Sequence, residues 1–200
     1  VLVSPPQETI ERWDNLAMHR RILAIASADA HGHRQRILGP IYRTIFPYNV
    51  ELRSLRTHIL LKEPLSRDFK QAKIQLFQAL RSCRVFISNY RWGNAMGFRF
   101  WAQSPKMYAL IGDRMVVNSK MRFIVEAPDK AKIRLIKNSD VIAEAEGQKA
   151  EFSAKKIGAY RVELWKKEKG WIFSNHIYVV PPGRLFKKRR NYREKKHNAK

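Results

Sequence analysis

Three polar residues that could hold a divalent metal follow one apolar run near the start of the sequence. The run is Ile22–Ser27, and Asp29, His31 and His33 come after it at alternate positions. Residues two apart on an extended backbone point to the same side, so the carboxylate and the two imidazoles would share one side. Both donor types bind transition metals. From spacing alone, a metal site and an ordinary polar turn after a strand are equally good interpretations.

The elements around this run predict how the three residues would be positioned. A helix should end near Arg20, since Ile10, Trp13 and Ala17 recur at helical spacing on one face. The run 22–27 is mostly apolar rather than alternating, a pattern typical of a strand covered on both faces in a parallel sheet. A helix, a buried strand and then polar residues indicate an α/β barrel or a doubly wound sheet, where sites lie at the carboxyl ends of strands.

The rest of the chain changes in character near residue 105. Residues 34–65 are rich in loop signals, and Ser66 is the expected N-cap of a helix that runs through Arg81. From Met107 to Val180 the sequence has short alternating runs, the clearest at 122–126, 132–136, 160–164 and 171–174, with turns expected at 138–140 and 168–170. This pattern predicts a small β-sandwich.

Two strand residues in this half have a structural interpretation. Tyr160, in Gly158-Ala-Tyr160, has the position of a tyrosine corner, in which the phenol holds an adjacent loop. An ordinary core tyrosine explains it equally well. His176 lies between Asn175 and Ile177 in a strand and is expected to be a structural histidine.

Charge points to anionic partners. The net charge is +23, and the last 17 residues, Arg184–Lys200, hold nine Lys/Arg and one acid, so nine minus one gives a net +8. Such an excess attracts polyanions and phosphorylated ligands.

No apolar run reaches the ~20 residues of a membrane span. The single cysteine, Cys83, excludes an intrachain disulfide. The single cysteine and the absence of a visible signal peptide favour a cytoplasmic protein. The missing initiator Met suggests that the sequence is a piece of a longer protein.

Several motifs together resemble those of one enzyme family. Trp13-Asp-Asn-Leu16 followed by Ser27-Ala-Asp-Ala-His-Gly32 is similar to the last barrel strand of PHP-family (polymerase and histidinol phosphatase) phosphoesterases. Phe46-Pro-Tyr48, Arg56-Thr-His58 and Gly97-Phe-Arg-Phe100 resemble the region that follows the barrel in a long subgroup. Gly158-Ala-Tyr-Arg161 and Trp171-Ile-Phe-Ser-Asn175 resemble its terminal immunoglobulin-like domain.

The resemblance implies an α+β fold. Residues 1–105 would be the closing segment of a distorted β/α barrel with its post-barrel region, 106–182 a β-sandwich, and 183–200 a disordered basic tail. Asp29 and His31 would be metal ligands, with His33, Arg56 and His58 as substrate-binding candidates. The complete protein would hold two or three divalent ions (Zn, Mn or Fe) that activate water to hydrolyse a phosphorylated small molecule or nucleotide.

The family also needs an upstream His-x-His motif, and none precedes Glu8. Two ligands are too few for a stable zinc site, so we expect this chain alone to bind metal weakly and to be inactive while the parent protein is a phosphoesterase. The alternative hypothesis is a non-catalytic binding module whose sandwich and tail (Arg184–Lys200) engage an anionic partner such as nucleic acid. The oligomeric state stays open.

Overall fold

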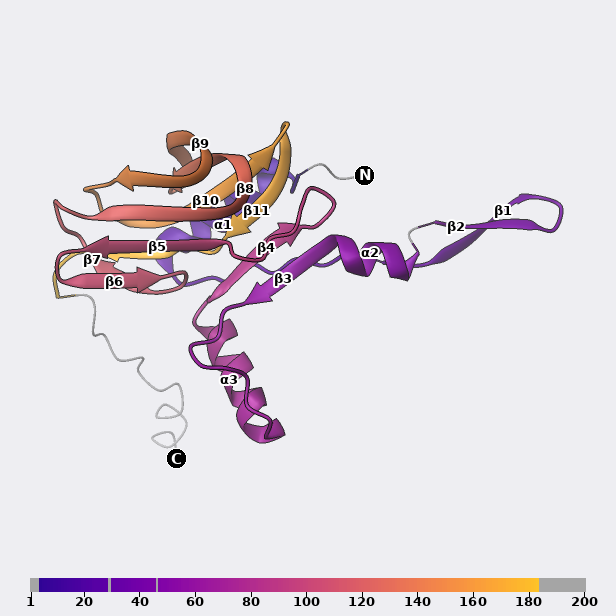
Figure 1. Ribbon diagram of the computed structural model, residues 1–200, viewed down its shortest axis with the longest axis horizontal. Helices are drawn as coiled ribbons and strands as arrows, with labels where there is room; N and C mark the ends of the chain where they lie inside the picture. Colours follow the sequence, from indigo (N-terminus) through magenta and orange to yellow (C-terminus); the bar gives the residue numbers. More distant parts are fainter. Residues whose placement is uncertain (1–3, 29, 46, 184–200) are drawn as a thin grey trace, which may run out of the picture.

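The computed structural model describes residues 4–28, 30–45 and 47–183, and most of them build one antiparallel sheet (Figure 1). About half of the described residues are strand (47%) and 19% are helix. Within the described residues the main sheet has ten strands, with the order β3-β4-β11-β10-β8-β5-β6, while β9 pairs with β8 and β12 joins β10 to β7. The bounds are β3 (Leu55–Ile59), β4 (Val85–Asn89), β5 (Arg99–Ser104), β6 (Met107–Leu110), β7 (Arg114–Val116), β8 (Arg122–Lys137), β9 (Asp140–Ser153), β10 (Gly158–Lys166), β11 (Lys169–Ser174) and β12 (Ile177–Val180).

The long strand β8 makes the sheet curl into a half-barrel. Its first part, from Arg122 to Glu126, pairs with β5, and its second part, from Lys132 to Lys137, pairs with β10. The pairing between β8 and β9 is interrupted between Glu126 and Ala131, a stretch that contains Pro128, which cannot donate a ladder hydrogen bond. A break at this point lets the two parts of the sheet turn toward each other around a common interior.

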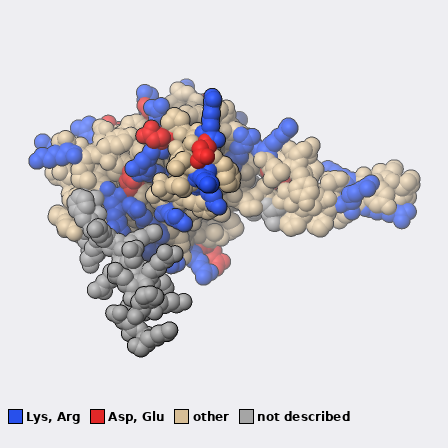
Figure 2. Space-filling view, turned by 90° about the horizontal axis from the view of Figure 1, so that it is seen from below, with Lys and Arg blue, Asp and Glu red and all other residues tan. Residues whose placement is uncertain are grey.

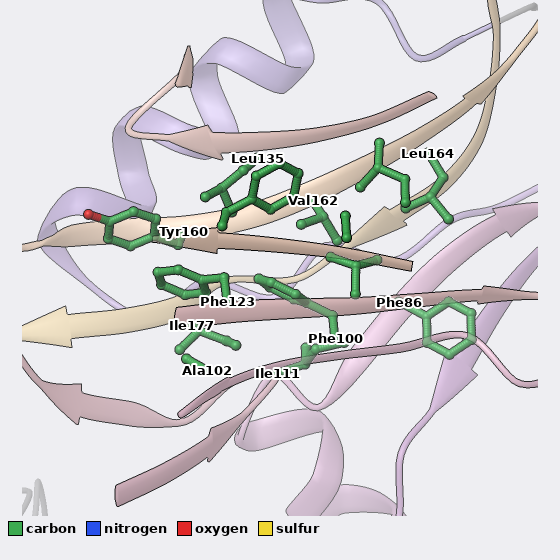
Figure 3. Packing of buried hydrophobic residues seen from close by; sticks show 14 of the residues in the cluster. Phe86, Phe100, Ala102, Ile111, Phe123, Leu135, Tyr160, Val162, Leu164 and Ile177 are labelled. Carbon is green, nitrogen blue, oxygen red and sulfur yellow. The ribbon is translucent and has the colours of Figure 1, made fainter. Parts of the chain in front are cut away.

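Alternate side chains of these strands fill the inside of the curl. Phe123 stacks between Phe100 and Tyr160, with ring centroids 5.9 and 4.5 Å apart, and Figure 3 shows these rings beside Leu135 and Val162 in one shared layer. All five side chains are almost completely buried. This layer is the main hydrophobic core and positions the outward-facing residues of β8 and β10.

Helix α1 (Gln7–His19) covers the outer face of the sheet. Ala17 packs against Ala159 of β10 and Tyr178 of β12, with Ile22 at the edge of this second small cluster. Because Tyr160 and Ile177 belong to the inner core, their neighbours Ala159 and Tyr178 face outward by strand alternation. The helix is therefore held on the convex side of the half-barrel.

Four further elements extend from the β3 side of the body (Figure 1). Strands β1 (His33–Leu38) and β2 (Ile41–Ile45) form a separate two-stranded sheet, and α2 (Tyr48–Ser54) connects it to β3. Helix α3 (Phe69–Arg81) links β3 to β4, and its N-cap is Asp68, whose carboxylate accepts the Gln71 backbone N–H at 2.9 Å.

The predicted fold class, an α+β chain with the closing segment of a β/α barrel, is wrong. The described residues contain three helices and a mostly antiparallel curled sheet, and this sheet includes β3, β4 and β5 as well as the strands after Met107. Residues 22–27 form no strand. The division into domains at residues 105 and 182 stays a prediction.

The run at 22–27 is extended, but side chains rather than a neighbouring strand satisfy its backbone. Asn175 Oδ1 accepts the Ala24 N–H and its Nδ2 donates to the Ala24 carbonyl, both at 3.0 Å. Thr57 Oγ1 accepts the Ala26 N–H at 2.9 Å and donates back to its carbonyl at 3.1 Å. The segment therefore lies as a strap on the outer face of the sheet, with its residues half-buried or exposed rather than covered on both faces.

Candidate functional site

The predicted metal ligand His31 lies at the base of the β1–β2 hairpin, next to His33. Asp29 is outside the described residues. His31 and His33 are exposed, and their rings are parallel within 2° with centroids 5.5 Å apart. Gly32 between them has φ +60°, and a Cβ there would lie 2.7 Å from Tyr48 Cε2, so glycine permits this tight approach. The structure thus brings the predicted ligand His31 beside His33, which is a substrate-binding candidate.

Arg56 and His58 lie on a different face of the sheet from the strap. Both are on β3, where side chains alternate, and Thr57 between them is the residue that binds Ala26. Arg56 lies over the Tyr90 ring at 3.8 Å. His58 stacks on Phe86 at 4.2 Å and its Nε2 is 2.8 Å from Ser88 Oγ. Burial, followed by the charge of Arg56, lowers the pKa of His58.

The described residues do not make a complete metal site. Among residues 4–28, 30–45 and 47–183, no group of three or more His, Cys, Asp or Glu side chains could hold an ion. His31 and His33 supply two donors, fewer than the three or four protein ligands of a zinc site. The metal and substrate roles assigned to these residues stay predictions.

Sequence reasoning did not foresee the most buried polar cluster, which joins α1 to the sheet. Arg161 donates to both Asp14 oxygens, and its Nη1 also donates to Glu163 Oε1 at 2.6 Å. The second Glu163 oxygen accepts the indole N–H of Trp165, and His176 Nε2 is 2.8 Å from Asp14 Oδ1. His176 is fully buried, as its structural interpretation requires, but it lies between β11 and β12 rather than in a strand, and its Nδ1 has no hydrogen-bond partner among the described residues. Since Asp14 is wholly buried, this cluster stabilises the fold and has no access to a substrate.

A basic groove lies where the β10–β11 turn meets the bend of β8 and β9. We call it the tryptophan groove; its open volume is about 820 Å³. Trp92 and Trp165 provide its aromatic lining. The remaining lining residues are Arg91, Asp129, Lys130, Ala131, Lys132, Glu146, Gly147, Lys166, Lys167, Glu168 and Lys169.

Cations in and beside this groove are held over indole rings. Lys169 Nζ lies 4.3 Å from the Trp92 ring centroid, and Lys166 Nζ lies 3.9 Å from that of Trp171. Trp171 is itself fixed, because its indole N–H donates to the Gly93 carbonyl at 2.9 Å. A cation over an aromatic face gains electrostatic attraction, so these ammonium groups have restricted positions. The run Trp165-Lys-Lys-Glu-Lys-Gly-Trp171, with three lysines between two tryptophans, is the sequence signal for this arrangement.

The groove keeps a positive balance after its internal ion pairs are counted. Six lysine and arginine residues line it against three acids. Lys166 pairs with Asp129 at 2.7 Å, and this hydrogen bond lowers the pKa of the Asp129 carboxyl. Among the described residues, no acidic partner lies within ion-pair distance of Lys130, Lys167 or Lys169. These three ammonium groups are available for an anionic ligand.

Comparisons of the chain with protein-family models, with curated proteins and with solved structures found no match. The resemblance to the PHP family therefore stays a prediction that depends on the motifs alone. In the part of the chain that the structure describes, no helix is long and apolar enough to cross a membrane.

Proposed function

We propose that this chain is a non-catalytic binding module that holds a polyanion, single-stranded nucleic acid in particular, along the tryptophan groove. The observation that carries the proposal is Lys169, held over the Trp92 ring beside an open, net-positive groove in which Lys130 and Lys167 also have no acidic partner among the described residues. A positively charged groove with aromatic side chains is the common design of sites that follow a single-stranded backbone.

The geometry favours phosphate contacts over base reading. Each groove tryptophan already has a cation over one face of its indole. Lys169 lies over Trp92, and the Arg134 guanidinium lies 5.1 Å from the Trp165 ring centroid. A lysine whose position is already restricted loses less conformational entropy when it meets a phosphate. Phosphate contacts carry no sequence information, so binding should be tolerant of sequence and strongly dependent on salt.

The proposal is tested by fluorescence anisotropy with a fluorescein-labelled oligothymidylate. The double variant Lys167→Glu/Lys169→Glu should lower affinity at least ~10-fold and reduce the logarithmic salt slope by about 1.4, which is two lost contacts on a single strand. Lys106→Glu/Lys149→Glu is the matched control, since both lysines are exposed and neither lines the groove. An equal loss of affinity in the control variant would mean that the oligothymidylate is attracted by net charge alone, and it would refute binding in the groove.

The basic tail needs its own control. Residues 184–200 carry a net +8 (nine minus one) and lie outside the described residues. Deleting them should weaken binding, because fewer counterions are released. Unchanged affinity would exclude a part for the tail. In either case the difference between groove and control variants should persist in the shortened chain if the groove itself binds.

The phosphoesterase hypothesis stays a prediction about the parent protein. The described residues do not fit a complete metal centre, so no catalytic step follows from them. The binding proposal is independent of it and predicts that alanine at Asp29 and His31 leaves oligothymidylate affinity unchanged.

A further inference from the structure

The β1–β2 hairpin projects from the body as an arm of residues 33–45 (Figure 1). It is a sheet of its own, separate from the ten-stranded sheet. All six residues of β1 and four of the five in β2 are exposed. A lone two-stranded ribbon is only marginally stable in water, so a surface that covers the arm would stabilise it.

The end of the arm is apolar, and the part nearer the body is basic. Ile37, Leu38, Ile41 and Tyr42 are 61, 74, 58 and 50% exposed, on either side of the Gly39–Pro40 turn. We call residues 37–42 the tip. A contiguous aliphatic surface left exposed on a small element commonly marks a contact site.

Three arginines lie on the two strands beside the tip and form what we call the collar, and the Nε of one of them, Arg36, donates to the Gly39 carbonyl in the turn. They are Arg34, Arg36 and Arg43, and the arm contains no acidic residue. Arg34 lies 4.9 Å from the Tyr42 ring centroid, and Arg36 faces Tyr42 across the ribbon. Figure 2 shows Lys and Arg side chains along this projection.

An anionic bilayer is the surface that suits both parts of the arm. Aliphatic side chains gain free energy in hydrocarbon, whereas the grooves of a nucleic acid present phosphates and hydrogen-bonding base edges. Arginine binds phosphate oxygens with two parallel N–H donors, and tyrosine is enriched at the membrane interface. The tip extends about three residues beyond the collar, ~10 Å of strand, which matches the ~5–10 Å depth of interfacial insertion.

We propose that the arm is a membrane-binding ribbon: the tip enters the outer acyl layer of an anionic phospholipid bilayer while the collar binds the headgroup phosphates. The arm and the tryptophan groove share no residue, so this proposal does not depend on the proposed function. It describes attachment to one leaflet rather than a span.

Sedimentation with phosphatidylserine-containing vesicles tests the proposal, with pure phosphatidylcholine vesicles as the uncharged comparison. Leu38→Ser/Ile41→Ser should lower the partition coefficient at least ~10-fold, because two side chains no longer enter hydrocarbon. Val141→Ser/Ile142→Ser is the matched control, since these residues are 50 and 43% exposed near the end of another hairpin. Arg36→Glu/Arg43→Glu should abolish the preference for anionic vesicles.

A label reports insertion without altering the rest of the arm. An NBD fluorophore on Leu38→Cys should shift its emission to the blue with anionic vesicles, and one on Val141→Cys should not; Cys83 is buried and escapes the reagent. Wild-type partitioning of the tip variant, or no blue shift at residue 38, would overturn the proposal. Loss of oligothymidylate affinity in the arm variants with vesicle binding intact would assign the arm to nucleic acid and would overturn it as well.

Discussion

Asp14 and Arg161 form a two-pronged ion pair between residues 147 positions apart in the sequence. Arg161 Nε and Nη2 donate to the two Asp14 carboxylate oxygens at 2.7 and 2.8 Å. The side chains are 0 and 1% exposed. Because one partner is on α1 and the other on β10, the pair fixes the helix to the outer face of the sheet.

Replacing Arg161 should therefore destabilise the protein strongly. Arg161→Met leaves the Asp14 and Glu163 carboxylates buried without their main partner, and removing one partner of a buried ion pair costs about 3–5 kcal/mol. Urea unfolding measures this loss. The control is Arg122→Met, whose pair with Glu151 is more than half exposed on both sides and should contribute only ~0–1 kcal/mol. Equal losses in the two variants would contradict the role of the cluster.

The same cluster should make stability depend on pH. Burial lowers the pKa of His176 from its ordinary value of 6.5, and the hydrogen bond to the Asp14 carboxylate only partly offsets this. Burial raises the pKa of Asp14, but the hydrogen bonds and charges of Arg161 and His176 outweigh burial and leave it below 3.8. In both cases the unfolded chain binds the proton more readily than the folded chain.

Both effects have the same sign: the free energy of unfolding decreases as the solution becomes more acidic. The contribution of His176 is complete above pH 6.5 and is lost as the pH falls toward its folded pKa; that of Asp14 is lost below about 3.8. Over the first interval the free energy of unfolding should fall by no more than about 1.4 kcal/mol per pH unit for this histidine. His176→Gln should reduce the slope between pH 6.5 and 5, and an unchanged slope would refute the assignment. His58→Gln is a second test of the same kind. Because the pKa of His58 is also lowered, this variant should reduce the slope as well.

Asn175 should control the local stability of the strap. Its buried amide bonds both backbone groups of Ala24 and also donates to the Val85 carbonyl at 3.0 Å. Asn175→Ala leaves both Ala24 groups unpaired, at about 1–3 kcal/mol each where they stay buried, while the Val85 carbonyl keeps the backbone N–H of residue 175. Hydrogen exchange should accelerate at the Ala24 amide. Thr57→Val should accelerate exchange at Ala26 instead, so identical effects of the two variants would argue against separate anchors.

Local pattern was sufficient to predict the strands of the second half. The runs at 122–126, 132–136, 160–164 and 171–174 are confirmed as strands, because period-two alternation and turn residues act within a few positions. Tyr160 does hold an adjacent loop, since its hydroxyl donates to the Lys156 carbonyl at 2.6 Å. The sequence pattern predicts a turn at 168–170. The observed turn begins one residue earlier, at Lys167 and Glu168, both of which have positive φ.

The errors arose where distant side chains replace local partners. An apolar run at 22–27 suggests a buried strand, but Asn175 and Thr57, far along the chain, supply its hydrogen bonds. A smaller error has a local cause. The helix predicted from Ser66 begins after Asp68, because Ser66 Oγ accepts the Asp68 N–H and the Asp68 carboxylate caps the helix. Spacing in the sequence also cannot show that Asp14, Arg161 and His176 meet, since 147 and 162 positions separate Asp14 from the other two.

The metal-site prediction is tested by zinc titration calorimetry. The chain should bind zinc weakly, because Asp29, His31 and His33 provide at most three ligands and the described residues supply no further cluster. Asp29→Ala/His31→Ala should abolish this binding. His19→Ala removes an exposed histidine elsewhere and is the control. Zinc affinity that the double variant retains would exclude both residues as ligands, and unchanged oligothymidylate affinity in that variant would separate the metal site from the groove.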